Sequence, residues 1–214
     1  MKITLLCSDP NHPVNIYLKP WMAAQQGIHE VELLQNKSQL SGGQMLFLIS
    51  CSEIIKESDR SKYLTTLVLH ASDLPKGRGW SPHIWAIIDG AEQITLSLLE
   101  AEDKVDSGRI WVKIQIPVPK DALWDEINHL LFTAEIQLID LAVQQFGQLT
   151  PAMQTNEEEA TYHPKRTPQD SQMDPYKTIA EQFNRMRVCD PNRFPIFFEL
   201  YGKKYKLILE HYDE

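Results

Sequence analysis

Two short apolar runs constrain the fold of this chain more than any other feature of its sequence. One lies in "SGGQMLFLISC" at residues 41–51 and shows none of the polar alternation of a half-exposed strand, and the other covers residues 64–69 and ends at His70. An apolar strand without alternation is typical of a parallel sheet that helices cover on both faces. Segments with helical patterns separate the strands along the chain, so the sequence predicts an α/β fold built on an open, mostly parallel sheet.

The other expected elements continue this alternation. Strands are expected at residues 3–7, 30–34, 93–101 and 109–118, and helices at 15–26 with an interruption near Pro20, 56–63, 80–90, 122–146 and 175–188. Residues 93–101 and 109–118 alternate more strictly between polar and apolar side chains, which favours a mixed edge of the sheet. Near the C-terminus, "FPIFFELYGKKYKLILEH" predicts a hairpin that turns at Gly202.

The length and the composition suggest three parts. A chain of 214 residues is long enough for one large α/β domain with a small appendage. We expect the domain at residues 1–150, a linker or surface loop at 151–172, and a small helix-and-hairpin unit at 173–214. The middle segment is rich in Glu, Thr and Pro, which favours a flexible connection without a function.

The net charge of −8 disfavours a nucleic-acid partner, because nucleic-acid affinity comes largely from basic side chains that neutralise phosphates. Two short basic clusters, "KGR" at 76–78 and "KRTP" at 165–168, are candidates for holding one small phosphate ester. No apolar stretch approaches the roughly 18 residues of a membrane span, and the first residues read as a strand. We therefore expect a cytoplasmic protein without a membrane partner.

The first candidate site is at the end of an expected strand. Parallel sheets bind ligands just beyond the carboxyl ends of their strands, and His70 is at such an end. Asp106 is in the polar stretch "EAEDKVDSGR" between two later strands. A carboxylate beside an imidazole fixes its tautomer or favours its protonated form, which prepares the ring to move a proton.

A longer motif surrounds this pair. The residues His70, Ser72, Leu74, Pro75, Gly79, Asp106 and Gly108 fit the pattern His-x-Ser-x-Leu-Pro-x-x-x-Gly, followed by Asp-x-Gly about thirty-six residues after the histidine. The chain resembles the folate-dependent formyltransferases from its start to about residue 146, and its last segment is similar to the short C-terminal element of sugar N-formyltransferases. The resemblance implies a Rossmann-like formyltransferase fold, N10-formyltetrahydrofolate as co-substrate and no metal. It also implies that His70 relays the proton of an attacking amine or stabilises the oxyanion, while Asp106 orients and charges the ring.

One position departs from the family pattern. The family has an asparagine two residues before the histidine, and this chain has Val68, which cannot donate a hydrogen bond to an oxyanion. Losing one oxyanion donor costs roughly 3 kcal/mol of transition-state stabilisation. Either Ser72, a backbone N–H or a bound water takes over this role, or the protein is a noncatalytic folate- or nucleotide-binding relative.

The resemblance also implies where the folate binds. Family members hold the pterin mainly through the backbone of two loops, which on this chain correspond to Ser52, Glu53, Ile54 and Ile55, and to Glu102, Asp103, Lys104 and Val105. An alternative interpretation is that Ile54 and Ile55 are core residues at the start of a helix.

The sequences of two segments suggest which substrate accepts the formyl group. "CSDPNHPVNIYLKPW" lacks the Gly- and Ser-rich phosphate loop of glycinamide ribonucleotide formyltransferases, and the acidic chain shows neither a basic face nor the RNA-binding domain of methionyl-tRNA formyltransferases. Together with "LPKGRGWSPHIW", it resembles formyltransferases that act on UDP-linked 4-amino-4,6-dideoxy sugars in pseudaminic-acid-type pathways. Rival acceptors are glycinamide ribonucleotide and a carrier-bound amino acid.

The residues expected to contact the nucleotide sugar are His12, Asn15, Lys76, Arg78 and Trp80. Lys76 and Arg78 could meet a diphosphate through charge-assisted hydrogen bonds, and Trp80 could offer a flat apolar surface to a ring. Alternatively, the tryptophan is a core residue and His12 caps a turn. The exposed strands of the C-terminal hairpin invite pairing with a second copy, which would give a homodimer.

Overall fold

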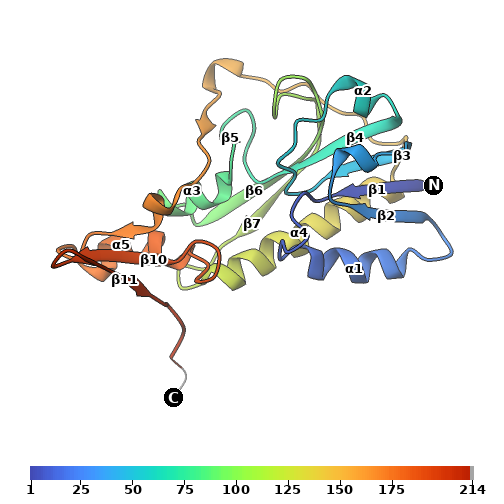
Figure 1. Cartoon of the computed structure of the whole chain (residues 1–214). Coiled ribbons are helices and arrows are strands. Elements are labelled where there is room, and N and C mark those ends of the chain that lie inside the picture. Colours follow the sequence, from blue (N-terminus) through green and yellow to red (C-terminus); the bar gives the residue numbers. More distant parts are fainter. Residues whose placement is uncertain (213–214) are drawn as a thin grey trace.

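The structure is a computed structural model that describes residues 1–212, and its centre is a six-stranded sheet (Figure 1). The strands are β1 Lys2–Leu6, β2 Glu30–Leu34, β3 Gly43–Leu48, β4 Tyr63–His70, β6 Gln93–Glu100 and β7 Ile110–Pro117, in the order β2-β1-β3-β4-β6-β7. The first four strands run parallel, while β6 and β7 are antiparallel to their neighbours. The predicted α/β fold with a mostly parallel sheet is confirmed, including its mixed edge.

The register aligns the carboxyl ends of the parallel strands at one edge of the sheet. Leu6 of β1 pairs with Leu48 of β3, and Leu48 pairs with Val68 of β4. His70 therefore lies two residues beyond this aligned row, at the edge where the expected binding loops begin.

Helices cover both faces of the sheet unequally. On one face, α1 (Asn15–Ala24) and α4 (Trp124–Gln144) pack against each other and against the sheet and bury most of the core, whereas the other face carries a smaller cluster of apolar side chains beside α2 (Glu57–Arg60) (Figure 1). The short helix η1 spans Lys37–Gln39 and follows β2. Burial on both faces explains why β3 and β4 are apolar without regular alternation.

The helix α1 continues through Pro20, so the expected interruption at this position is wrong. A proline inside a helix removes one hydrogen bond to the carbonyl four residues earlier. That residue, Ile16, is 73% exposed, which places the freed carbonyl on the solvent side of the helix.

The helix α3 (Pro82–Ile88) is shorter than the expected segment 80–90. Ser81 has a positive φ of 46°, and Pro82 begins the helix, where its missing N–H costs nothing. Trp80 consequently lies in the loop before α3.

The segment after α4 is an ordered strap, which we define as residues 151–167, rather than the silent linker expected at 151–172. It contains η2 (Glu157–Glu159) and β8 (Tyr162–His163), and β8 pairs in parallel with β5 (Arg78–Gly79). The strap therefore lies directly against the loop that follows His70. Figure 1 shows it as the light-orange segment that leads from the top of the molecule toward α5.

The helix and the hairpin expected at the C-terminus are present. After η3 (Pro168–Ser171) come β9 (Gln172–Met173), α5 (Ile179–Arg187), β10 (Ile196–Leu200) and β11 (Lys203–Leu207). The hairpin turns at Tyr201 and Gly202, which both have positive φ angles, as a two-residue turn of this kind requires. Met173, Met186 and Ile196 belong to the main core cluster, so this unit packs onto the body of the molecule.

Within residues 1–212, no helix is both long and apolar enough to cross a membrane. The three cysteines are free thiols in the structure. No group of three or more His, Cys, Asp or Glu side chains within the same residues has the arrangement of a metal site.

Candidate active site

His70 and Asp106 lie together, as the motif predicts. Nδ1 of His70 is 3.5 Å from Oδ1 of Asp106, and both side chains are more than nine-tenths buried. The other ring nitrogen, Nε2, lies 2.8 Å from the carbonyl oxygen of Gly77. The imidazole thus stands between two acceptors, and only a ring that carries protons on both nitrogens can donate to both.

The backbone around Asp106 depends on two glycines of the motif. The N–H of Gly79 donates to Oδ2 of Asp106 at 2.9 Å, and Gly79 has a φ of +96° that a larger residue would rarely adopt. A Cβ atom at Gly79 would overlap the carbonyl oxygen of His163, and one at Gly108 would overlap that of Glu100. The close approach of three chain segments therefore explains why the motif has glycine at both positions.

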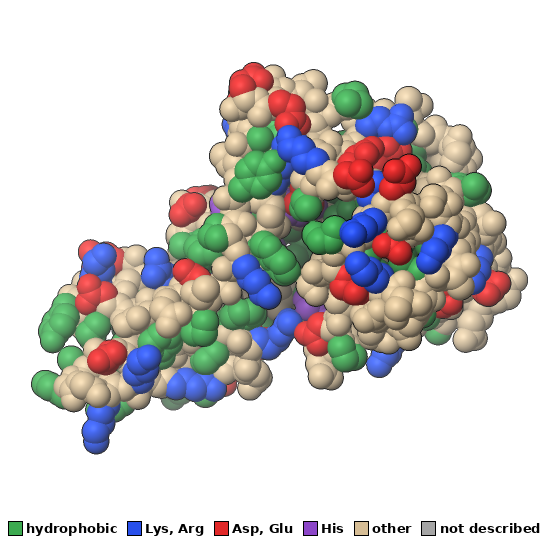
Figure 2. All heavy atoms as spheres, turned by 45° about the horizontal axis from the view of Figure 1, so that its top comes forward, with side chains coloured by type: hydrophobic (Ala, Val, Ile, Leu, Met, Phe, Trp, Pro, Cys, Tyr) green, Lys and Arg blue, Asp and Glu red, His purple; other side chains and the backbone are tan. Residues whose placement is uncertain are grey.

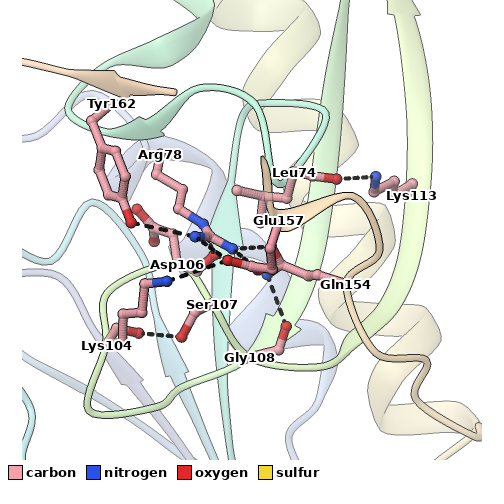
Figure 3. Close-up of polar contacts among 10 residues, drawn as sticks. All are labelled: Leu74, Arg78, Lys104, Asp106, Ser107, Gly108, Lys113, Gln154, Glu157 and Tyr162. Atoms are coloured by element: carbon pink, nitrogen blue, oxygen red, sulfur yellow. Dashed lines mark hydrogen bonds and ion pairs between the residues drawn. The ribbon is translucent and has the colours of Figure 1, made fainter. Parts of the chain in front are cut away.

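Arg78 does not face a ligand site, which corrects its expected role at a diphosphate. Its side chain is fully buried, and its guanidinium forms a bidentate ion pair with Glu157 of the strap (Figure 3). Nε of Arg78 donates to the backbone oxygen of Asp106 at 3.0 Å. The arginine is committed to an internal network that holds the Asp106 loop.

The strap completes this network. Nε2 of Gln154 donates to the carbonyl oxygens of Asp106 and Gly108, at 2.9 Å each, and its Oε1 accepts from Arg78 (Figure 3). The hydrogen bonds from Arg78 lower the pKa of Glu157 to about 2, so this carboxylate is charged at neutral pH. Sequence reasoning missed Gln154 and Glu157, because nothing in a Glu- and Thr-rich segment marks which carboxylate meets an arginine far away in the chain.

The strap also contacts the loop on the other side of His70. Oγ1 of Thr161 accepts from the N–H of Gly77 at 2.8 Å, and the carbonyl of Thr161 accepts from the N–H of Arg78 at 2.9 Å. Gly77 is the residue whose carbonyl meets His70. The strap therefore supports both backbone partners of the His70–Asp106 pair.

Lys76 and Trp80, the other residues of this loop that were expected to contact the nucleotide sugar, differ in how free their side chains are to bind a ligand. Nζ of Lys76 forms an ion pair with Glu159 at 2.7 Å, which raises the pKa of the lysine and already compensates its charge. Trp80 is 41% exposed and lies beneath the Nζ of Lys165, 4.8 Å from the ring centre. Lys165 covers one face of the ring, and the contact of Trp80 with a ligand stays a prediction.

The two predicted folate loops lie beside each other. Arg60 joins them, because its Nη1 donates to the carbonyl of Ile55 at 2.7 Å and its Nη2 to Asp103 at 2.7 Å. Ile55 is buried in the smaller core cluster, while Ile54 is 61% exposed. The core interpretation therefore applies to Ile55 and not to Ile54.

The other residues of these loops are placed as follows. The backbone N–H of Ser52 donates to Ser8, and the carboxylate of Glu53 accepts from the backbone of Lys37. Glu102 is exposed, Val105 is 49% exposed, and Lys104 forms an ion pair with Glu157 at 3.3 Å. Lys104 thus links the second folate loop to the strap.

The two candidates after the first strand hold their own loop. Nδ2 of Asn15 donates to the carbonyls of Asp9 and Pro10, at 3.1 Å each, and the side chain is 7% exposed. Nδ1 of His12 accepts from the N–H of Val14, and burial lowers the pKa of His12 to about 4. The contact of His12 agrees with the alternative interpretation that this residue caps a turn. The Nδ2 group of Asn15 already donates to two backbone carbonyls and is therefore not free to bind a substrate.

The position of the missing asparagine is apolar. Val68 packs at the edge of the smaller core cluster. The hydroxyl of Ser72 is buried and has no hydrogen-bond partner among the described residues. Ser72 is one of the residues that line a cavity of about 230 Å³, together with Gly77, Thr161 and His163.

A model of the formyl transferase family matches residues 8–143, which is more than half of the chain. The chain belongs to the formyl transferase family. A curated relative, methionyl-tRNA formyltransferase of Lactococcus lactis subsp. cremoris (strain MG1363), is 29% identical over 140 residues, which cover 64% of this chain and 43% of the relative. The chain spans less than half the length of the curated relatives it matches.

Solved structures share the fold over nearly the whole chain. Methionyl-tRNA formyltransferase from Clostridium thermocellum matches with a TM-score of 0.80 and 20% identity and covers 96% of both chains. HypX from Aquifex aeolicus in complex with tetrahydrofolic acid gives 0.76 and 20%, covering 95% of this chain and 36% of HypX. A sugar N-formyltransferase from Shewanella sp FDAARGOS_354 gives 0.75 and 12%, covering 100% and 99%. At these identities the likeness establishes the fold alone.

Proposed function

We propose that this protein transfers the formyl group of N10-formyltetrahydrofolate to the 4-amino group of a nucleotide-linked 4-amino-4,6-dideoxy sugar. UDP is the nucleotide that the resemblance favours, and a pseudaminic-acid-type pathway is the setting. The observation that carries the proposal is the contact of His70 with Asp106 at 3.5 Å, inside a loop that the backbone of Gly77 and Gly79 holds on both sides.

The reaction moves one proton along with the formyl group. The amine nitrogen attacks the formyl carbon and loses a proton, the bond from that carbon to N10 breaks, and N10 gains a proton. The intermediate carries a negatively charged oxygen. A histidine between a carboxylate and a carbonyl can hold the moving proton, and its positive charge stabilises the oxyanion.

Folate as co-substrate is supported by the family and by the complex of HypX with tetrahydrofolic acid. The two loops that Arg60 joins, at 52–55 and 102–105, are where we place the pterin. The exposed side chain of Ile54 is suited to contact its apolar face.

The sugar acceptor is supported by two observations. The sugar N-formyltransferase from Shewanella matches over the whole of this chain, including the C-terminal helix and hairpin. The net charge of −8 disfavours a large polyanion such as transfer RNA.

A second candidate acceptor is an aminoacyl-tRNA. The curated relatives named above are methionyl-tRNA formyltransferases, and they match 140 to 149 residues of this chain. The chain spans less than half of their length, whereas the solved methionyl-tRNA formyltransferase from Clostridium thermocellum matches 96% of this chain in fold.

Incubation with N10-formyltetrahydrofolate and a panel of amines tests the proposal. The panel contains UDP- and dTDP-linked 4-amino-4,6-dideoxy sugars, glycinamide ribonucleotide, a carrier-bound amino acid and methionyl-tRNA, and the formylated product is detected by mass spectrometry. We expect product with a sugar nucleotide and none after His70→Asn, whereas His129→Asn, on the outer part of α4, retains activity. Turnover of methionyl-tRNA alone would replace the sugar by the second candidate. Binding of folate without turnover of any amine would identify a noncatalytic relative.

A further inference from the structure

Two basic clusters in the sequence, at 76–78 and 165–168, are candidates for binding a phosphate ester. The two clusters differ in their ion pairs. In the first cluster, both cations have carboxylate partners within the strap: Lys76 pairs with Glu159, and Arg78 pairs with Glu157. In the second cluster, neither Lys165 nor Arg166 forms an ion pair with any carboxylate of residues 1–212. The second cluster therefore has no carboxylate of the described residues within ion-pair distance, and Asp170 interacts with Arg166 only over a longer range.

Arg166 is unusual because it is buried as well as unpaired. Its side chain is 8% exposed, and its guanidinium lies over the ring of Phe194 at 5.0 Å. Nη2 donates only to neutral groups, the hydroxyl of Ser171 at 3.1 Å and the thiol of Cys189 at 3.7 Å, while the buried Nε has no partner among the described residues. A buried charge without an adjacent counter-ion is costly, so this guanidinium is suited to bind an anionic ligand.

The pairing of β5 with β8 places this charge beside the candidate active site. The two strands run in parallel, with Arg78 opposite Tyr162 and Gly79 opposite His163, so the residues that follow each strand continue side by side. Three contacts show this continuation: the N–H of Trp80 donates to His163, the indole of Trp85 donates to the carbonyl of Pro164 at 3.3 Å, and Lys165 covers the ring of Trp80. The carbonyl that meets His70 lies immediately before β5.

A second unpartnered polar atom belongs to the same neighbourhood. Nδ1 of His83, in the first turn of α3, is buried and has no hydrogen-bond partner among the described residues. Burial, together with smaller electrostatic effects of His70, Arg166 and His12, lowers the pKa of His83 to about 3. His83 thus lies within electrostatic reach of both Arg166 and the catalytic histidine.

The surface is hollowed between the part formed by the C-terminal residues and the rest of the molecule, and Lys and Arg side chains border this hollow (Figure 2). An anion in such a place would be attracted against the negative net charge of the whole protein. Arginine is well suited to this task, because its planar guanidinium can bind phosphate oxygens with two hydrogen bonds.

We propose that Arg166, with Lys165 and the ring of His83, forms the subsite for the diphosphate of the acceptor substrate, and that Trp80 flanks it. The inference rests on the proposed function for the identity of the acceptor, and it replaces Lys76 and Arg78 by the second basic cluster. The anion compensates the buried guanidinium and holds the amino sugar on the side of His70.

Binding of inorganic pyrophosphate to the whole chain tests the subsite without any chemistry. The measurement is isothermal titration calorimetry in metal-free buffer, in the absence of folate and acceptor, so that a protein that fails to transfer formyl groups can still show the subsite. We expect Arg166→Gln to weaken pyrophosphate binding about tenfold or more, because hydrogen bonds to charged groups of this kind are lost. Lys165→Gln, at an exposed position whose replacement leaves the core intact, weakens it by a smaller factor.

The matched control is Arg109→Gln, which removes an exposed arginine paired with Glu100 outside the proposed subsite. This variant retains the affinity of the original protein. An equal loss in Arg109→Gln and Arg166→Gln would reduce the effect to general electrostatics and overturn the proposal, as would unchanged binding in both Arg166→Gln and Lys165→Gln. A parallel titration with 5-formyltetrahydrofolate distinguishes the source of the anion. If Arg166→Gln weakens only this binding, the guanidinium holds the carboxylates of the folate tail and the subsite for a diphosphate is rejected.

Discussion

Nδ1 of His70 lies 3.5 Å from Oδ1 of Asp106, although β5, α3 and β6 separate the two residues along the chain. The second carboxylate oxygen accepts from the N–H of Gly79, and the second ring nitrogen meets the carbonyl of Gly77. His70 and Asp106 therefore each have one contact with the backbone and one contact with each other. This arrangement restricts both rotation of the ring and rotation of the carboxylate.

Replacing Asp106 with asparagine should lower kcat by about 10² to 10⁴, because the amide cannot stabilise the protonated ring. The hydrogen bond to Gly79 can persist through the amide oxygen, so we expect the fold to remain. Steady-state kinetics and circular dichroism check both statements, with Asp125→Asn at the exposed start of α4 as the control. Equal activity of the two variants would remove Asp106 from the mechanism.

Replacing Glu157 with glutamine should lower kcat while it leaves the KM for folate nearly unchanged. The change removes the carboxylate that compensates the buried guanidinium of Arg78, and this guanidinium holds the backbone of Asp106. The exposed neighbour Glu158 gives the matched control Glu158→Gln. Glu157→Asp keeps the charge and should recover part of the lost kcat, which a loss caused by misfolding would not allow.

Introducing asparagine at Val68 should raise kcat by roughly tenfold or more if the oxyanion lacks a donor, since one such donor is typically worth about 10² to 10³. Val68 packs beside apolar side chains, so the same change should lower the melting temperature. Kinetics and thermal melting measured on one preparation test both effects. An unchanged kcat would show that another group already supplies the donor.

Ser72 is the side chain that we expect to supply that donor. Its hydroxyl is buried without a partner, so Ser72→Ala should reduce kcat more than Val68→Ala does. Ser72→Ala removes a hydroxyl just after the end of β4, and Val68→Ala removes two methyl groups two residues before His70, so each variant is a control for the other. Small and equal effects in both would leave a backbone N–H or a bound water as the donor.

Glu135 should make the stability of the protein depend on pH. This residue of α4 is 5% exposed, its Oε2 has no partner among the described residues, and burial raises its pKa to about 8. Because the folded protein keeps this proton while the unfolded chain loses it above about pH 4.5, the free energy of unfolding falls as the pH rises from about 4.5 to 8. The expected loss is a few kcal/mol, roughly 1.4 for each unit of pKa shift.

Glu135→Gln removes the titrating group and keeps the shape of the side chain. Urea unfolding at several pH values should therefore show a flatter dependence for this variant and a higher stability at pH 8 than in the original protein. Parallel pH dependences would mean that Glu135 is ionised in the folded state.

The sequence predicted the sheet well because the pattern of each strand reflects its own burial. The apolar run in β3 and the alternation in β6 and β7 are local features, and each indicates how many faces of the strand are covered. The pair His70 and Asp106 was predictable for another reason: a multi-part motif fixes the spacing of both residues and of the glycines between them.

The fate of Arg78 could not be predicted in this way. A basic residue beside the expected active site fits a diphosphate as well as it fits a carboxylate, and the choice depends on where Glu157 lies in space. The contacts of the strap could not be predicted for the same reason, because its hydrogen bonds join residues that are far apart in the chain. Arg166 shows the reverse case, since its sequence context resembles an ordinary solvated cluster while its side chain is buried.

The contacts of Gln154 and Glu157 have a consequence for dissecting the molecule. Both residues come after position 143, where the match to the family ends, yet they fix the backbone that carries Asp106. A fragment cut after the last turn of α4 would retain every strand of the large sheet and lose the hydrogen bonds that hold the backbone of Asp106. A fragment for chimeras or domain exchange should therefore extend past the segment that matches the family model and end after β8.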